Sequence, residues 1–202
     1  MGLAGLTKAE LTRAAIIDAA LAMAREGGLE SLTIGTVAEQ AGLSKSGVFS
    51  RVGSREELQV AVLKEYQRRF IEAALVPALR EPRGLPRLRA LVAGWARWIG
   101  TDTGRAGCLF VSGAVEYDDR PGPVRDAVLE GLGELRRHVA RNVRQAVDEG
   151  QLPADTEPEQ VAFELSAIVL GLHNDLRLFR DERALKRAFA AFDRLLAGKA
   201  AH

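Results

Sequence analysis

The chain has 202 residues, of which 47% are apolar and 27% are charged, and its formal net charge is +1. This composition is typical of a globular protein and excludes a disordered or fibrous chain, while the near-neutral charge argues against a broad non-specific nucleic-acid binder. The sequence contains neither an uninterrupted apolar run of roughly 18 residues nor a secretory signal. Its single cysteine, Cys108, rules out an internal disulfide and fits a reducing compartment. We therefore expect a cytoplasmic protein without a membrane span.

The first predicted helix begins after Thr7, which can cap it together with Glu10 three residues later. Apolar residues then recur at helical spacing from Ile17 to Ala24. The pair Gly27-Gly28 ends the helix, because a glycine readily supplies the left-handed residue after a helix.

The stretch from residue 33 to residue 58 reads TIGTVAEQAGLSKSGVFSRVGSREEL. Thr33 can cap a two-turn helix, Gly42 permits a positive φ at a tight corner, and Ser44 can cap a second short helix. Two short helices joined through a glycine turn are a helix-turn-helix. A capping box from Ser54 to Glu57 then starts a longer helix of about five turns.

Prolines at positions 77, 82 and 86 interrupt the helical pattern after this helix. Amphipathic helices follow, and no strand, repeat or low-complexity tract is apparent. We predict an all-α protein of about nine helices, with a helix-turn-helix domain over residues 1–56 and a second helical domain over residues 57–202. The helices predicted in the second domain cover residues 88–99, 105–117, 123–149, 156–179 and 181–196.

Residues 33–58 resemble the DNA-binding unit of the tetracycline-repressor (TetR) family of bacterial regulators. The family pattern combines a threonine-started helix, an Ala-Gly-Val/Leu-Ser corner, a lysine, an aromatic residue and a Gly-Ser-Lys/Arg-Glu-Glu-Leu cap. This chain has Thr33, Ala41-Gly42-Leu43-Ser44, Lys45, Phe49 and Gly53-Ser54-Arg55-Glu56-Glu57-Leu58 in those places. With the preceding helix, the resemblance covers about 60 residues, and the length and helical body also suit the family.

Two departures from the family pattern affect DNA contacts. Phe49 stands where the family commonly has Tyr, so a hydroxyl-to-phosphate bond is absent there. Arg51 and Val52 stand where His and Phe are common, and Arg51 adds a candidate phosphate or guanine contact.

The resemblance implies that the second helix of the motif enters the major groove with its N-terminal residues nearest the bases. Between Ser44 and Arg55 the chain has three basic residues and no acid, which favours a small DNA-contacting surface. Gly47 lacks a Cβ and would allow the backbone to approach DNA closely. The DNA-binding candidates are Thr33, Ser44, Lys45, Ser46, Gly47, Phe49, Arg51, Ser54 and Arg55.

One such unit contacts only a few base pairs, so a homodimer on a near-palindromic double-stranded operator is expected, with the two reading helices roughly 34–36 Å apart. In the family, the two final helices form a four-helix dimer interface. Carried over to this chain, the interface candidates are Leu165, Val169, Leu172, Leu176, Phe189 and Phe192.

The resemblance also implies a small-molecule pocket among the middle helices, with an effector that the sequence does not identify. Ordinary core packing competes with this role for most candidates, and an internally satisfied histidine competes for His173. The candidates are Trp95, Trp98, Cys108, Phe110, Val111, Val115, His173 and Asn174. Cys108 follows Gly107 at a helix start, which permits a redox or electrophile sensor, although a lone cysteine is more often a small buried hydrophobe.

These features predict a ligand-responsive transcriptional regulator, most simply a repressor released from its operator by a small molecule. The alternatives are a DNA-binding regulator without a small-molecule effector and a sensor that acts through Cys108. An enzyme is disfavoured: the histidines lack metal-ligand spacing, no phosphate-binding loop follows a strand, and the acidic residues from Glu116 to Asp119 adjoin a Pro-Gly loop. We expect no catalytic residue, metal or cofactor.

Overall fold

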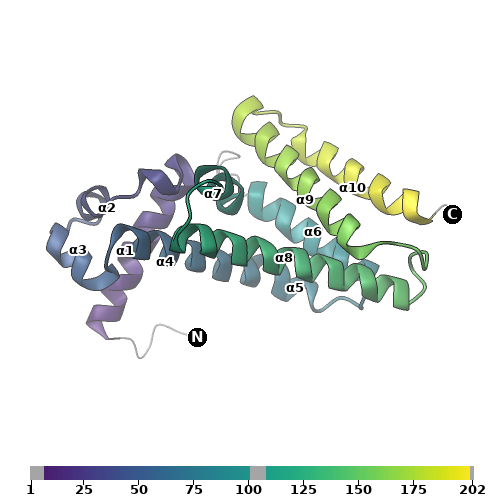
Figure 1. Ribbon diagram of the computed structural model, residues 1–202, viewed down its shortest axis with the longest axis horizontal. Coiled ribbons are helices and arrows are strands. Elements are labelled where there is room, and N and C mark those ends of the chain that lie inside the picture. Colours follow the sequence, from purple (N-terminus) through teal and green to yellow (C-terminus); the bar gives the residue numbers. More distant parts are fainter. Residues whose placement is uncertain (1–6, 101–107, 201–202) are drawn as a thin grey trace. The chain divides into compact units, whose positions relative to one another are not determined.

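The computed structural model describes residues 7–100 and 108–200, and within these ranges every regular element is a helix (Figure 1). The all-α prediction is confirmed. None of the described helices is long and apolar enough to cross a membrane. Residues 105–107, predicted to start a helix, lie outside the described residues.

The chain forms two compact units. The first unit comprises residues 1–67 and 112–129, and the second unit comprises residues 68–111 and 130–202. The sequence predicts a single boundary between residues 56 and 57, with each domain formed by one continuous segment. The first compact unit instead combines two segments, the second of which comes from much later in the sequence.

The helices of the first unit begin where side chains cap them. Thr7 and Glu10 form the predicted capping box, and Gly28 ends the first helix with φ 81°. Ser54 and Glu57 form a second box, with the Ser54 N–H donating to Glu57 Oε2 over 2.7 Å. The first segment of this unit contains α1 (Lys8–Gly27), a 3₁₀ turn (Leu29–Ser31), α2 (Ile34–Gln40), α3 (Lys45–Val52) and all but the last three residues of α4 (Arg55–Phe70).

The corner between α2 and α3 takes the shape that its glycine permits. Gly42 has φ 63°, and the Leu43 N–H donates to the Ala38 carbonyl over 2.9 Å. Beneath the corner, Val37 and Val48 are fully buried. These contacts pack α2 and α3 against each other and α1, as in a helix-turn-helix.

After Phe70, α4 continues as a π-helix (Ile71–Leu75) and a last turn, α5 (Val76–Ala78). Pro77 has no N–H and its ring clashes with the carbonyl four residues earlier, so a regular α-helix cannot continue through this point. The sequence pattern located the break but did not indicate the π-helix.

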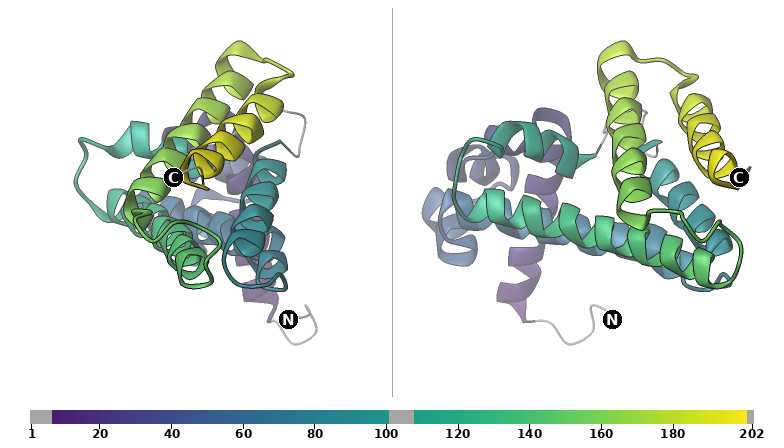
Figure 2. Two further views of the ribbon diagram at one scale, coloured as in Figure 1. Left: turned by 90° about the vertical axis from the view of Figure 1, so that its right-hand side faces the viewer. Right: turned by 45° about the vertical axis from the view of Figure 1, so that its right-hand side comes forward.

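The second unit contains α6 (Leu85–Gly100), the start of α7 (Leu109–Tyr117), most of α8 (Pro123–Asp148), α9 (Pro158–Asn174), a π-helix (Asp175–Phe179) and α10 (Ala184–Ala200). Helices α9 and α10 lie side by side (Figure 2). The predicted start of α9 at Thr156 is one residue too early: Glu157 occupies the N-cap position, because Pro158 is well suited to the first helical turn.

Helix α6 crosses the π-helix after α4 at a glycine. A Cβ built on Gly94 would lie 2.9 Å from Ala74 Cα, closer than real Cβ contacts come. Beside this crossing, the Phe70 ring makes edge contacts with Trp95 and Trp98 at centroid distances of 6.1 and 6.3 Å. Small residues therefore set the helix separation, and aromatic rings fill the space beside them.

Replacing Gly94 with Ala is expected to lower the free energy of unfolding by about 1–2 kcal/mol, because the cost of overpacking exceeds the gain in helix propensity. Gly133→Ala is the matched control: an added Cβ would meet only the flexible end of Arg137 at 3.2 Å, so this variant should be as stable as the wild type or slightly more stable. Urea unfolding followed by tryptophan fluorescence measures both. Equal stability of the two variants would contradict the role assigned to Gly94.

Candidate nucleic-acid interface

The exposed side of α3 carries the residues predicted to contact DNA. Ser44 caps the helix by accepting from the Gly47 N–H over 3.0 Å. Lys45 and Ser46 are exposed at its N-terminal end, where the helix dipole favours a phosphate. Val48 and Val52, on the opposite side, are buried. The helix therefore uses one face for packing and leaves the other free.

Phe49 lies on the free face with 59% of its surface exposed. Leaving more than half of a phenylalanine in water forgoes roughly 1–2 kcal/mol of burial free energy. Phe49 is one of the predicted DNA contacts. Its exposure means that it contributes little to the core of the chain and is available to a partner.

Gly47 and Arg51 are coupled on this face. The Arg51 guanidinium folds back and donates to the Gly47 carbonyl over 2.8 Å. A Cβ built on Gly47 would meet only Ser44 Oγ at 3.0 Å and an Arg51 nitrogen at 3.9 Å. Packing against distant elements therefore does not require a glycine at position 47. A glycine destabilises the helix relative to alanine, and the fold gives no reason for this loss of stability.

Helix α2 begins beside Lys45. The Thr33 and Thr36 side chains cap each other's backbone N–H groups over 3.0 and 3.1 Å, and both residues are exposed. Gly35 lies next to the Lys45 side chain, since a Cβ there would be 3.3 Å from Lys45 Cε. Thr33 is one of the predicted DNA contacts, whereas Thr36 is not. A threonine at the third helical position is a local capping signal that could have identified it.

Arg55 and Ser54 have structural tasks at the start of α4. Arg55 Nε donates to the Leu32 carbonyl over 2.7 Å, and a terminal nitrogen donates to the Glu30 carbonyl over 2.8 Å. The Ser54 hydroxyl caps α4 by accepting from the Glu57 N–H over 3.2 Å. The Ser54 N–H in turn donates to the Glu57 carboxylate, and this bond is the largest cause of the lowered pKa of the Glu57 carboxyl. The Arg55 guanidinium is therefore directed toward the turn before α2, so we leave Arg55 out of the proposed DNA contacts.

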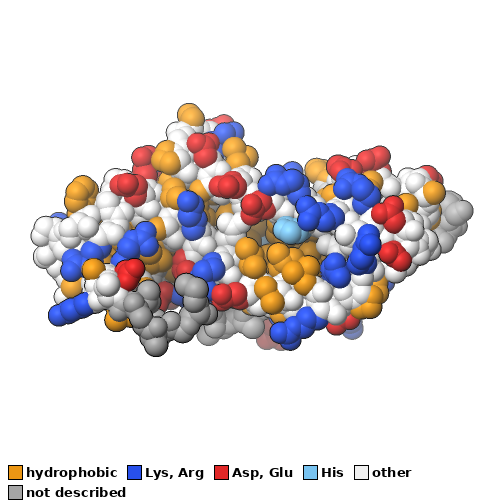
Figure 3. Space-filling view, turned by 90° about the horizontal axis from the view of Figure 1, so that it is seen from below, with side chains coloured by type: hydrophobic (Ala, Val, Ile, Leu, Met, Phe, Trp, Pro, Cys, Tyr) orange, Lys and Arg blue, Asp and Glu red, His pale blue; other side chains and the backbone are white. Residues whose placement is uncertain are grey.

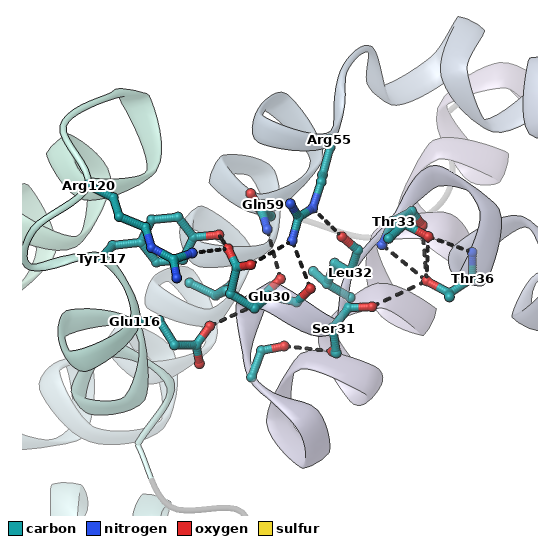
Figure 4. A network of polar contacts seen from close by, with 12 residues as sticks. Glu30, Ser31, Leu32, Thr33, Thr36, Arg55, Gln59, Glu116, Tyr117 and Arg120 are labelled. Carbon is teal, nitrogen blue, oxygen red and sulfur yellow. Dashed lines mark hydrogen bonds and ion pairs between the residues drawn. The ribbon is translucent and has the colours of Figure 1, made fainter.

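The same turn is held by residues from the later segment of the first unit (Figure 4). The Glu30 carboxylate accepts from the Tyr117 hydroxyl over 2.6 Å and pairs with Arg120 at 3.0 Å and Arg55 at 3.2 Å. The Glu30 N–H donates to Glu116 over 2.8 Å. We call this set, together with Gln59 of α4, which donates to the Leu29 carbonyl over 2.8 Å, the turn clamp.

The electrostatics of the turn clamp follow from these contacts. The Tyr117 hydroxyl is the largest cause of the lowered pKa of Glu30, and Arg55 and Arg120 add to it. Burial first, and then the Glu30 carboxylate, raise the pKa of Tyr117. Glu30 is accordingly ionised and its charge is compensated. Sequence reasoning missed this cluster, because residues 30 and 117 carry no local signal of their contact.

The predicted pocket residues divide into buried and exposed groups. Trp95, Cys108 and Phe110 are buried, whereas Val115 is 70% exposed and Asn174 is also exposed. Val111, Trp98 and His173 are intermediate. Trp95 borders an apolar cavity of about 20 Å³ between α6, α9 and α10, which has Leu165 and Phe189 among its other lining residues. A cavity of this size has room for about one water molecule, so it cannot hold an effector without rearrangement.

His173 and Cys108 meet at the start of α7. The Cys108 N–H donates to His173 Nδ1 over 2.9 Å, which fixes this nitrogen as an acceptor. Burial, with a smaller contribution from Arg177, lowers the pKa of His173 to about 4. The imidazole is therefore neutral at neutral pH and supplies no positive charge that would activate the Cys108 thiol.

The predicted dimer-interface residues pack inside a single chain. Leu165, Val169, Leu172, Leu176 and Phe192 are buried, and Phe189 is half-buried beside the small apolar cavity. These side chains have little surface left for a partner. The opposite side of α9 and the following π-helix exposes a second stripe at helical spacing, formed by Phe163, Ala167, Leu170, Gly171, Asn174 and Leu178.

Comparison with known families finds two matches in this chain. Residues 16–62 match the family described as "Bacterial regulatory proteins, tetR family", and residues 84–192 match "Tetracyclin repressor-like, C-terminal domain". The second match alone covers more than half of the 202 residues. A comparison with curated proteins finds no match.

Solved structures of TetR-family regulators share the fold. One from Streptomyces coelicolor has a TM-score of 0.82 at 19% identity, with 95% of this chain and 97% of that chain covered. One from Chloroflexus aurantiacus J-10-FL has a TM-score of 0.83 at 19% identity, with 95% and 96% covered. A TetR-family regulator from Cytophaga hutchinsonii has a TM-score of 0.81 at 17% identity, with 98% of each chain covered.

The burial of His173 beside Cys108 predicts a pH-dependent stability. The pKa of His173 falls from an ordinary value of 6.5 to about 4 on folding, so the unfolded chain takes up its proton at higher pH than the folded chain. The stability from the neutral imidazole is complete above pH 6.5 and is lost as the pH falls toward 4.

Urea unfolding at a series of pH values between about 4 and 7.5 measures this loss. His173→Gln keeps an oxygen acceptor for the Cys108 N–H but cannot titrate, so the variant should lose stability less steeply than the wild type over the same range. The pH dependence of stability that remains in the variant comes from other groups. One of these is His138, whose pKa is also lowered by burial. Identical slopes in the two proteins would refute the assignment.

Proposed function

The chain belongs to the TetR family of bacterial transcriptional regulators, and we propose that it is a repressor that binds a near-palindromic operator as a homodimer. In this proposal, a small molecule that binds the second unit releases the protein from DNA. The proposal of DNA binding rests on the free face of α3, where Lys45, Ser46 and Phe49 are exposed. On the opposite face, the buried side chains of Val48 and Val52 hold the helix in place.

The chemistry of this face suits a major groove. Lys45 and the N-terminal end of α3 offer positive charge to phosphates, and Phe49 offers an apolar ring to sugars or thymine methyl groups. Arg51 reaches a phosphate or a guanine once it leaves the Gly47 carbonyl. The absence of a side chain at Gly47 lets the helix backbone lie close to the DNA.

The wider surface adds little non-specific attraction. The net charge is +1, and basic and acidic side chains are interspersed over the face in Figure 3. Affinity must then come from local contacts in two half-sites at once, which favours a dimer. We assign the dimer surface to the exposed stripe of α9, where Phe163 and Leu170 are more than half exposed.

An effector that acts through the second unit would enlarge the apolar cavity beside Trp95. Leu165, Val169 and Leu172 line this cavity from the inner side of α9, and the outer side of the same helix carries the proposed dimer surface. A ligand that wedges α9 away from α6 would therefore alter the arrangement of the two protomers. The electrophile-sensor alternative gains no support, because Cys108 is buried and His173 is neutral.

The DNA-binding proposal is tested by selection from a pool of random duplexes, which should return a near-palindromic sequence. Lys45→Ala should weaken binding to that sequence, and the slope of log K against log salt should become shallower by about 2, one phosphate contact for each protomer. Lys64→Ala, at an exposed lysine on α4, is the control. The proposal fails if no sequence is enriched or if both variants bind equally well.

The dimer proposal is tested by sedimentation velocity. Leu170→Glu places a charge on the exposed stripe of α9 and should convert the dimer to a monomer at micromolar concentration without loss of helix content. Leu129→Glu is the matched control, because Leu129 is 53% exposed against 52% for Leu170 but lies in the first unit. A wild-type monomer, or a dimer that only Leu129→Glu disrupts, would contradict the assignment.

A further inference from the structure

The first unit contains a polar cavity of about 190 Å³ beside the turn clamp. Its walls come from the start of α4, the loop after α7 and the first turn of α8. The charged residues that line it are Glu30, Arg55, Glu56, Arg120 and Arg125. No residue of α3 lines this cavity, and the cavity belongs to a different unit from the one beside Trp95.

Arg120 and Arg125 retain donors for a ligand. Arg120 pairs with Glu30 through one terminal nitrogen at 3.0 Å, and its guanidinium lies 5.8 Å from the centre of the Tyr117 ring. Arg125 uses Nε to donate to the Asp118 carbonyl over 2.9 Å. Its two terminal nitrogens donate to no group in the described part of the chain. A planar guanidinium with free terminal N–H groups matches the oxygens of a carboxylate or a phosphate.

The acidic residues of the cavity do not cancel this positive charge. Glu30 is already compensated by the Tyr117 hydroxyl, Arg120 and Arg55. Glu56 is exposed at the rim and forms no ion pair with the described residues. The five charged residues together give the lining a formal charge of +1, and Glu56 is the one carboxylate that would repel an anion.

The first turn of α8 adds to the positive potential. Gly122, Val124 and Arg125 line the cavity at the N-terminal end of this 26-residue helix. The unpaired N–H groups of a helix N-terminus and its dipole favour a negative charge. By volume, the space is comparable to an engineered protein cavity of roughly 150 Å³ that binds benzene. It therefore has room for a small organic anion.

We propose that this cavity binds a small anion through a carboxylate or phosphate group held by Arg120 and Arg125. Such a ligand would share Arg120 with Glu30 and so act on the turn between α1 and α2. This site is separate from the DNA contacts and the effector cavity of the proposed function, and its test uses no DNA.

Isothermal titration of the full-length protein with inorganic phosphate, acetate and succinate tests the site, with sodium chloride holding the ionic strength constant. At least one of these anions should bind with a dissociation constant below about 10 mM, and the tighter class identifies the phosphate or the carboxylate as the preferred group. Arg125→Gln should weaken binding by about tenfold, the loss expected for one charge-assisted hydrogen bond. Arg125→Lys, which keeps the charge but loses the planar fork, should fall in between.

Glu56→Gln gives a result of opposite sign. Removal of the carboxylate at the rim should tighten anion binding severalfold, whereas a cationic or zwitterionic ligand would bind this variant more weakly. Arg136→Gln, at an exposed arginine of α8 in the second unit, should leave binding unchanged. The proposal is overturned if no anion binds, if Arg125→Gln and Arg136→Gln behave alike, or if Glu56→Gln weakens binding.

Discussion

The position of α2 and α3 depends on how the turn from Leu29 to Ser31 is held. A 3₁₀ turn leaves backbone carbonyls without helical partners, and buried carbonyls need donors. Arg55 and Gln59 supply these donors from α4, and Glu116 accepts from the Glu30 N–H. The entry to α2 is therefore fixed by side chains from α4 and from the much later helix α7. This constraint explains why the compact first unit includes residues 112–129 and is larger than the helix-turn-helix motif alone.

Local signals in the sequence were sufficient for the motif itself. The capping residues Thr7, Thr33, Ser44 and Ser54 all cap helices as predicted, because a cap involves residues only two or three positions apart. The corner at Gly42 follows from the φ that glycine allows. The turn clamp could not be predicted in this way, since 86 residues separate Glu30 from Glu116 and 87 separate it from Tyr117.

Helix α9 shows a different limit of sequence reasoning. Its apolar residues cover two faces, so periodicity indicates a helix but does not say which face packs against its own chain. Leu165 and Val169 face inward, while Phe163 and Leu170 face outward. A soluble monomer gains nothing from an exposed stripe of this kind, and such a stripe typically marks a protein interface. The packing of α10 against α9 identifies which face of α9 is buried within the chain.

Under the proposed function, the exposed stripe of α9 and the exposed face of α3 bind their partners through different interactions. The α9 stripe would bury apolar area in a dimer, an interaction that salt affects little. The α3 face combines a single exposed ring with few charges, so each protomer alone would bind DNA weakly and with marked salt dependence. In a dimer, once one protomer has bound its half-site, binding of the second protomer becomes intramolecular, and this raises the overall affinity for the operator. The gain exists only when the spacing of the two α3 helices matches the spacing of the half-sites. A small change in the arrangement of the protomers is then enough to abolish binding, because it removes this gain while leaving each DNA-contacting face intact.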